Sequence, residues 1–357
     1  MVTKASRLVF LALAAGAFGS VCAAPPLDAA PYRLVRSIAL GAGERWDYAT
    51  YDAASDRVFV AHGDHVTVVD VAKAEAIAQI GTFPGGTHGI GIAGDSGRGY
   101  TDDGKAGQVV AFDLASLKPG KVLAGAEDAD GIAYDPASGH VFVINGDNKS
   151  ITVVDPKANA VVQTIDVGSA LEAAVADGKG KLFVDGVSAH DIVVIDTRRN
   201  AVIAHYPMDG CERPHGIAVD ASARRVFATC INKVMVVVDA DNGRNVASVP
   251  IGEGSDGAAF DPQRKWIVSS NNEGTLSVIA ETDADHYVSL ATVPTASSAR
   301  TIAIDARSGR LFLPAATVAS VEAPSKPGAR AHVTYEAGSL KLLVLEPDPA
   351  FHLPGGH

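Results

Sequence analysis

Aspartate recurs about every 42 residues along most of this 357-residue chain, and this repeat constrains the fold more than any other feature. Each aspartate ends one short apolar segment and opens a turn into the next, as in YDPASGHVFV at 134–143. Aspartate is a common turn opener because its side chain bonds backbone groups shortly after it in the chain. The members of the series are Asp52, Asp95, Asp135, Asp177, Asp220, Asp261 and Asp305. A regular period of this length predicts an array of similar structural units.

A second series marks the end of a later strand in each unit. Its members are Asp70, Asp113, Asp155, Asp196 and Asp239, with Ala280 and Glu346 in the last two places. Each unit reads as four strands, which in the third unit are expected at 130–135, 140–145, 150–155 and 161–166. Four short strands in each unit of 40–45 residues are typical of a β-propeller. The sequence therefore predicts an all-β fold, with residues 24–357 forming one seven-bladed propeller.

The seventh unit lacks a fourth strand at its own end of the sequence. It contains strand patterns at 299–305, 310–315 and 340–346. Residues 33–41 match the fourth-strand pattern of residues 161–168. We therefore expect the N-terminal strand to complete the last blade and close the ring, which leaves no open sheet edge.

The repeat resembles that of the YncE-like, YVTN-repeat propellers of bacterial secreted and periplasmic proteins. The likeness rests on PHGIAVD at 214–220, RVFA at 225–228 and IVVID at 192–196, and it covers nearly all of 31–347. It implies a fold and a location, and no single activity. Trp46-Asp47 occurs once, in an innermost strand, so the repeated Trp-Asp signature of other propellers is absent from the sequence.

Seven residues stand at the start of the innermost strands, 41 to 44 residues apart, and the fold should gather them around one funnel. This axial ring consists of Asp47, His88, Asp130, Glu172, His215, Asp256 and Arg300. Carboxylates and imidazoles are ligands of divalent cations, so a metal site is predicted from His88, Asp130, Glu172, His215 and Asp256. Arg300 would orient a carboxylate or phosphate. The alternative is that these positions are polar only because propeller channels contain water.

Two functions follow from this ring. The first is a binding protein that takes a ligand, either a small molecule or a protein partner, at the funnel face. The second is a metal-dependent hydrolase, lactonase or lyase, an idea that rests partly on analogy with other propellers.

Two further features are expected on the same face. The ends of the second strands carry His62, Asp102, Asn145, Asp185 and Asn271, which would widen a pocket or serve only in ordinary turns. Residues 316–338 form an unusually long insertion in the last blade, which we interpret either as a lid or as a disordered or edge-wrapping loop.

Cys211 and Cys230 are the two cysteines that follow the N-terminal segment. Export makes a disulfide between them plausible, since the hairpin around 220–225 places them on one rim. Free thiols and a metal site formed by Cys211, His215 and Cys230 are the alternatives.

The N-terminal segment, residues 1–23, has the pattern of a secretory signal. Lys4 and Arg7 precede an apolar stretch that is too short to span a bilayer, and Val21-Cys22-Ala23 suits cleavage near Ala23. A lipid anchor at Cys22 is the alternative. We expect a periplasmic or secreted protein without a transmembrane segment, and a monomer.

The net charge of −11, with no basic run, argues against nucleic acid as a partner. Two short motifs are also discounted. The GIGIAG sequence at 89–94 has the spacing of a dinucleotide-binding loop, but it falls in an expected strand with no helix after it. The GDSG sequence at 94–97 aligns with the hairpin turns of other repeats.

Overall fold

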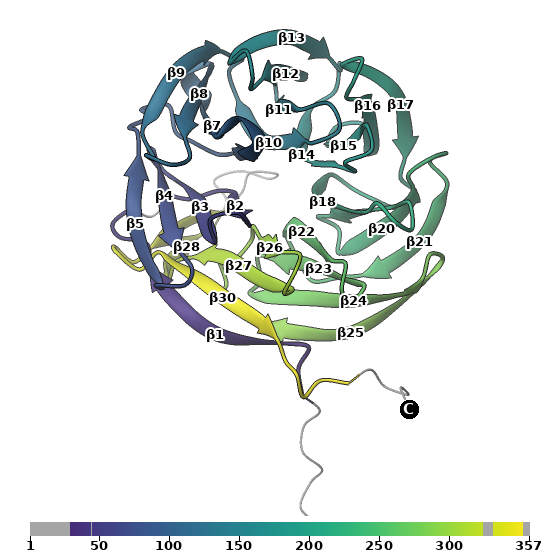
Figure 1. The fold of residues 1–357 in the computed structure, drawn as a ribbon. Coiled ribbons are helices and arrows are strands. Elements are labelled where there is room, and N and C mark those ends of the chain that lie inside the picture. Colours follow the sequence, from purple (N-terminus) through teal and green to yellow (C-terminus); the bar gives the residue numbers. More distant parts are fainter. Residues whose placement is uncertain (1–28, 44, 324–330, 353–357) are drawn as a thin grey trace, which may run out of the picture.

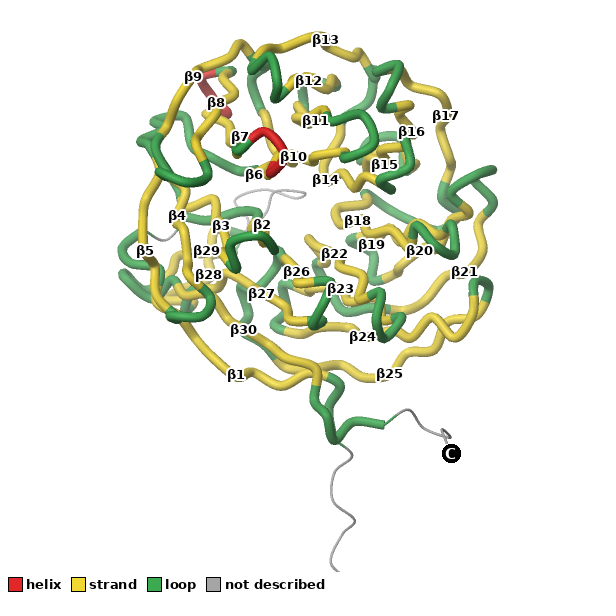
Figure 2. Tube along the Cα trace, viewed as in Figure 1, coloured by secondary structure: helices red, strands yellow, loops and turns green. Residues whose placement is uncertain are grey.

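The computed structural model describes residues 29–43, 45–323 and 331–352, and these form seven four-stranded antiparallel sheets. The sheets stand around a central axis as blades, with the first strand of each nearest the axis and the fourth at the rim (Figure 1). The predicted all-β, seven-bladed propeller is confirmed. The described residues contain no α-helix; two short 3₁₀ turns, η1 (Gly94–Ser96) and η2 (Gly104–Ala106), flank β7 (Figure 2).

Blades one to six are each built from four consecutive strands. Blade one contains β2 (Ala49–Asp52), β3 (Arg57–His62), β4 (His65–Asp70) and β5 (Glu75–Ile80). Blade two contains β6 (Ile90–Ala93), β7 (Arg98–Asp103), β8 (Gln108–Asp113) and β9 (Pro119–Ala124). Blade three contains β10 (Ala129–Asp135), β11 (His140–Asn145), β12 (Ser150–Asp155) and β13 (Ala160–Asp166). Blade four contains β14 (Leu171–Ala176), β15 (Lys181–Gly186), β16 (Asp191–Asp196) and β17 (Ala201–Pro207). Blade five contains β18 (Pro214–Asp220), β19 (Arg225–Cys230), β20 (Val234–Asp239) and β21 (Asn245–Pro250). Blade six contains β22 (Ser255–Asp261), β23 (Trp266–Asn271), β24 (Thr275–Asp283) and β25 (His286–Pro294).

Blade seven joins the two ends of the chain. It contains β26 (Ala303–Asp305), β27 (Arg310–Ala315), β30 (Lys341–Pro347) and, as its outermost strand, β1 (Tyr32–Ala39). β1 runs antiparallel to β30, with Tyr32 opposite Pro347 and Ala39 opposite Lys341. The predicted closure by the N-terminal strand is confirmed, so β30 is paired on both sides.

The recurring aspartates act as turn openers, as the repeat predicts. In six blades the Oδ1 atom accepts a hydrogen bond of 2.7–3.3 Å from the backbone N–H two residues further on. The assignment of Asp95 to this series was wrong. Ala93 pairs with Arg98 as Asp52 pairs with Arg57, so Ala93 holds the repeat position and Asp95 lies within the turn η1. The turn nevertheless has the same length, since Arg98 follows Ala93 by five residues as Arg57 follows Asp52, and within it the Ser96 hydroxyl donates a hydrogen bond to the Ala93 carbonyl.

Apolar side chains fill the space between each pair of neighbouring blades. The third residue of the second strand is aromatic and 0% exposed in six blades, at Phe59, Tyr100, Phe142, Phe183, Phe227 and Phe312. Both faces of each sheet are thus buried, which explains why the middle strands are apolar throughout. The described part of the chain includes no helix long and apolar enough to cross a membrane.

Candidate functional site

The seven predicted ring residues lie together at one end of the axis, each beside the start of an innermost strand. In blades three to six the strand pairing shifts at the ring residue, which is a β-bulge. A bulge leaves one residue out of the ladder and turns its side chain away from the sheet. For example, Pro214 pairs with Cys230 and Gly216 with Thr229, so His215 between them is free to point to the axis.

A small residue follows most ring residues because the innermost strands approach one another closely there. A Cβ on Gly89 would lie 2.1 Å from the Asp130 carbonyl oxygen, and one on Gly216 would lie 2.7 Å from Gly257. The glycine in the His-Gly pairs is therefore required for packing between blades, and it keeps the ring narrow.

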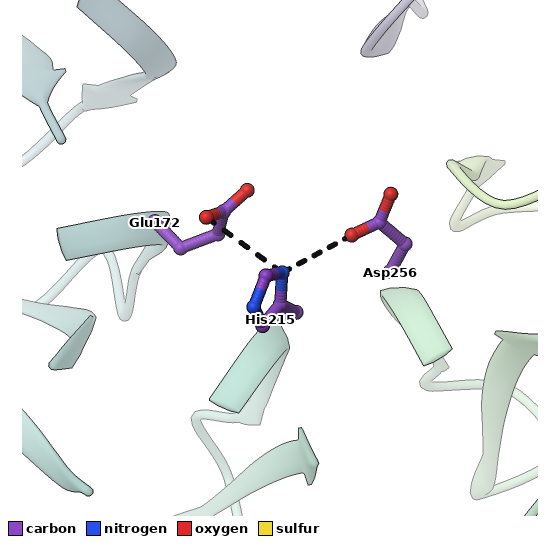
Figure 3. Close-up of side chains that lie close together, drawn as sticks. All are labelled: Glu172, His215 and Asp256. Atoms are coloured by element: carbon purple, nitrogen blue, oxygen red, sulfur yellow. Dashed lines mark hydrogen bonds and ion pairs between the residues drawn. The ribbon is translucent and has the colours of Figure 1, made fainter. Parts of the chain in front are cut away.

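Contacts between neighbouring blades connect much of the ring. The Arg300 guanidinium lies 3.3 Å from Asp256 and 3.7 Å from Asp47, and it donates a 3.1 Å hydrogen bond to the Trp46 carbonyl. His215 Nδ1 lies 3.2 Å from an Asp256 oxygen and 3.7 Å from a Glu172 oxygen (Figure 3). Residues more than 250 positions apart in sequence thus meet at the axis.

The second axial histidine, His88, is held in a pair of its own. Its Nδ1 lies 2.9 Å from the Asp102 carboxylate, which also accepts the backbone N–H groups of His88 and Gly89. Asp102 is fully buried, and its hydrogen bond raises the pKa of His88 to about 9. His88 is therefore a cation at neutral pH, and its charge is matched by Asp102.

Burial and repulsion raise the pKa values of two ring carboxyl groups. Burial raises the pKa of Asp47 to about 6, although the nearby Arg300 opposes the change. The pKa of Asp130 lies well above its usual range because the group is buried and because the carboxylate of Glu172 is close. Both effects disfavour a second negative charge in a confined site.

Tyr48 is a central residue of the site that the sequence analysis missed. It belongs to blade one, yet its hydroxyl reaches to within 3.4 Å of the Glu172 carboxylate on blade four. It also lines a cavity of about 170 Å³ between the innermost strands, below the ring. A signal was present in the repeat, since Tyr48 stands where four of the other blades have Gly89, Gly131, Gly216 and Gly257.

The long insertion of blade seven forms a hairpin over the ring. It contains β28 (Val318–Glu322) and β29 (His332–Tyr335), while residues 324–330 lie outside the described part. Tyr335 packs edge-on against Trp46, with 4.8 Å between ring centroids. It lines two cavities above the ring, one of about 210 Å³ with His88 and one of about 510 Å³ with His215. Arg300 borders both cavities, which together we call the funnel. The described parts of the insertion therefore pair with each other and lie on the predicted face. Whether the insertion opens and closes as a lid stays a prediction.

Cys211 and Cys230 form a disulfide, as predicted, with 5.5 Å between their Cα atoms. The alternatives of free thiols and of a metal site with Cys211, His215 and Cys230 were wrong, because both sulfur atoms are bonded to each other. The bridge ties the loop before β18 to the end of β19, beside His215.

The residues at the ends of the second strands do not widen the funnel. His62, Asp102, Asn145, Asp185 and Asn271 are all 0–1% exposed. Asn145 and Asn271 donate to hydroxyls of the next strand in their own blades. Only Asp102 reaches the ring, through His88. Asp185 is buried with neither oxygen hydrogen-bonded in the described structure, and burial raises its pKa well above the usual range.

Fold and site together define the class: a closed seven-bladed propeller with a polar, mostly acidic axial ring. Among solved structures the chain is similar to the WD40 repeats of RRP9, with 11% identity and a TM-score of 0.71, covering 88% of this chain and 98% of that one. It is similar to hydrazine synthase of Kuenenia stuttgartiensis, with 12% identity and a TM-score of 0.66, covering 84% and 96%. It also resembles a chain of the mitotic checkpoint complex, with 14% identity and a TM-score of 0.69, covering 96% and 98%.

At these identities the likeness shows the propeller fold alone. No protein-family profile matches the sequence, and no curated protein matches it. The likeness to YncE-like propellers therefore stays a resemblance, while the broader class, a seven-bladed β-propeller, is established.

Proposed function

We propose that this protein is a binding protein whose funnel takes a small cation or the positively charged group of a small ligand. The observation that carries the proposal is the charge of the ring. The ring holds four carboxyl groups, those of Asp47, Asp130, Glu172 and Asp256, and one guanidinium, that of Arg300, which lies against Asp47 and Asp256. The other cation, His88, is matched by Asp102. The floor of the funnel thus holds more acidic side chains than basic ones.

A bound cation would relieve the electrostatic cost of this arrangement. The raised pKa values of Asp47 and Asp130 show that their ionised forms are disfavoured where they stand. A positive charge among them would favour ionisation and gain attraction that is strong because water is largely excluded. The net charge of −11 would also attract cations from solution.

The walls of the funnel suit a small ligand with a positive group. Trp46 and Tyr335 offer aromatic rings, which attract cations through their π-electrons. The cavities of about 210 and 510 Å³ are of the size that small molecules occupy. Arg45 and Arg213 line these cavities and are exposed, so an acidic group on the same ligand would find partners there.

Tryptophan fluorescence tests the proposal, since Trp46 lines the funnel and Trp266 is the only other tryptophan. In a Trp266→Phe background we expect spermidine and Zn²⁺ to change the emission of Trp46 in a saturable way. Sulfate at the same ionic strength is the anion control and should cause no saturable change. Asp47→Asn should weaken cation binding by about tenfold or more, because a charge a few ångströms away is removed. A saturable response to none of the cations, or one that Asp47→Asn leaves unaltered, would refute the proposal.

We also propose that the protein acts outside the cytoplasm, in the periplasm or as a secreted protein. The pattern of residues 1–23 supports this, and so does the Cys211–Cys230 bridge, because disulfides persist mainly in oxidising compartments. Fractionation of cells that express the full chain, with N-terminal sequencing of the product, tests it. A product in the cytoplasm that retains residues 1–23 would contradict the proposal.

One observation favours a catalytic second candidate, a hydrolase, lactonase or lyase that uses a metal ion. Burial and the nearby Glu172 carboxylate raise the pKa of Asp130 well above its usual range, so a carboxyl group that can act as a proton donor stands beside Glu172. Acid release from simple esters and lactones, followed at constant pH with and without Zn²⁺, tests this candidate. It fails if the rate equals that of the Asp130→Asn variant.

A further inference from the structure

Three side chains of the ring converge on one point, and each comes from a different blade. Glu172, His215 and Asp256 lie on the adjacent blades four, five and six, and their facing ligand atoms all lie within 4.8 Å of one another (Figure 3). His215 Nδ1 is 3.2 Å from Asp256 Oδ1 and 3.7 Å from Glu172 Oε2. Atoms that share a metal ion at about 2.0–2.3 Å are separated by about 3–4 Å, so these spacings suit a common ion.

Groups outside this trio hold the remaining carboxylate oxygens. The Tyr48 hydroxyl lies 3.4 Å from Glu172 Oε1, and the Arg300 guanidinium lies 3.3 Å from Asp256 Oδ2. One oxygen of each carboxylate is thus directed to an outer partner, and the other faces His215. Metal ligands are typically oriented by such outer hydrogen bonds and ion pairs.

The imidazole ring of His215 is held in place, and its Nε2 atom has no hydrogen-bond partner in the described part of the chain. The side chain is 5% exposed, and it stands on the bulge of β18 beside the disulfide-bridged hairpin. Its Nε2 is buried and makes no hydrogen bond within the described part of the chain. In this structure Nδ1 carries a proton that it donates to the Asp256 carboxylate. A cation between Nδ1 and the two carboxylates would take the place of that proton, and the neutral imidazole would then carry its proton on Nε2.

We infer that Glu172, His215 and Asp256 form a site for one divalent transition-metal ion such as Zn²⁺ or Mn²⁺. This inference rests on the proposed cation-binding function and names the cation. One imidazole with two carboxylates suits these ions better than Ca²⁺ or Mg²⁺, which prefer oxygen ligands alone. The funnel above the trio leaves further coordination positions to water or to a ligand.

The trio is a smaller set than the five ligands predicted from the sequence. His88 is turned to Asp102 rather than to the other histidine, and the described residues bring only the trio within ligand distance of one point. Asp130 is not one of the three ligands, but its carboxyl group is close enough to interact electrostatically with Glu172. The metal site predicted from five ring residues is therefore reduced to the three on blades four, five and six.

Metal titration of chelator-treated full-length protein tests the site. Calorimetry with Zn²⁺, and loss of the free Mn²⁺ signal in electron paramagnetic resonance, should each show one ion per chain. Glu172→Gln and Asp256→Asn keep the side-chain shape, and each should weaken binding by at least tenfold, the lower range seen when even an outer partner is lost. Far-ultraviolet circular dichroism and thermal unfolding confirm that each variant is folded.

A matched control is available on the rim of blade four. His205 lies 2.7 Å from Asp191, so it is also an imidazole beside a carboxylate, but it lies apart from the trio. His205→Asn should keep the metal affinity of the wild type within about twofold. A pulsed measurement of nitrogen coupling to bound Mn²⁺ should detect an imidazole ligand that is lost in His215→Asn.

The outcomes separate this inference from the proposed function. Equal metal affinity in the wild type, Glu172→Gln and Asp256→Asn would overturn the site, as would loss of binding in His205→Asn. If spermidine binds in the funnel while neither metal binds, the metal site is wrong and the cation-binding function stands. If no cation binds, both fail.

Discussion

Replacement of Tyr32 by alanine tests how far the N-terminal strand stabilises the closed ring. Tyr32 begins β1, is 1% exposed and packs edge-on against Trp266 of blade six, with 5.8 Å between ring centroids. It belongs to the apolar cluster that joins blade six to blade seven. The side chain of Tyr32 therefore links β1, the strand that closes the ring, to blade six.

The expected loss of stability follows from this burial. Removing about 150–200 Å² of buried ring surface at about 25 cal/mol per Å² costs about 4–5 kcal/mol. Replacement of large buried side chains by alanine typically costs about 3–5 kcal/mol, which agrees. The unfolding entropy of a chain of this size is roughly 0.7 kcal/mol per kelvin, so Tm should fall by about 6 °C.

The matched control is Tyr32→Phe. The Tyr32 hydroxyl is buried and has no hydrogen-bond partner in the described structure, so its removal should leave stability unchanged or slightly higher. Guanidinium and thermal unfolding of the three proteins provide the measurement. A loss below about 1 kcal/mol in Tyr32→Ala, or an equal loss in both variants, would refute the reasoning. Deletion of residues 31–41 should destabilise more than either variant, because β30 would become an open edge.

Three further predictions concern the bridge, a buried acid and the ring. The double change Cys211→Ser and Cys230→Ser should lower the free energy of unfolding by about 3 kcal/mol, the loss expected for a bridge between cysteines with a sequence separation of 19. Unfolding in guanidinium without reductant measures this loss. A stability equal to that of the bridged protein would contradict the prediction. Asp185→Asn should stabilise the protein by about 1–3 kcal/mol at pH 8 and have little effect near pH 4. Burial raises the pKa of Asp185 in the folded protein, so the unfolded chain loses this proton more readily and folding becomes less favourable as the pH rises. An effect of the substitution that is independent of pH would exclude this cause. Cation affinity in the funnel should rise between about pH 5 and 7 as Asp47, whose pKa is about 6, loses its proton among Arg300, Asp256, His88 and Asp102. Calorimetric titrations across this range should show the rise in the wild type and a flatter profile in Asp47→Asn; identical profiles would contradict it.

The propeller architecture was predictable from the sequence because the recurring aspartates form turns with their immediate neighbours in the chain. Each recurring aspartate bonds a backbone N–H only two residues away, so the turn that it opens is encoded where it stands. The regular spacing then places the seven ring residues at equivalent points of the seven blades. Asp95 shows the limit of such alignment, since Ala93 occupies the turn-opening position of blade two and the nearest aspartate lies two residues further on.

The sequence by itself determined the number of blades, the closing strand and the membership of the axial ring, since each follows from the repeat. Only the tertiary structure decided which ring residues meet. The bulges that turn Glu172, His215 and Asp256 together arise from pairing between strands, and the reach of Tyr48 across the axis depends on the diameter of the closed ring. The same holds for His88, whose pairing with Asp102 removes it from the trio. Distances between side chains on separate blades are set by how the sheets pack, and no pattern within one repeat contains that information.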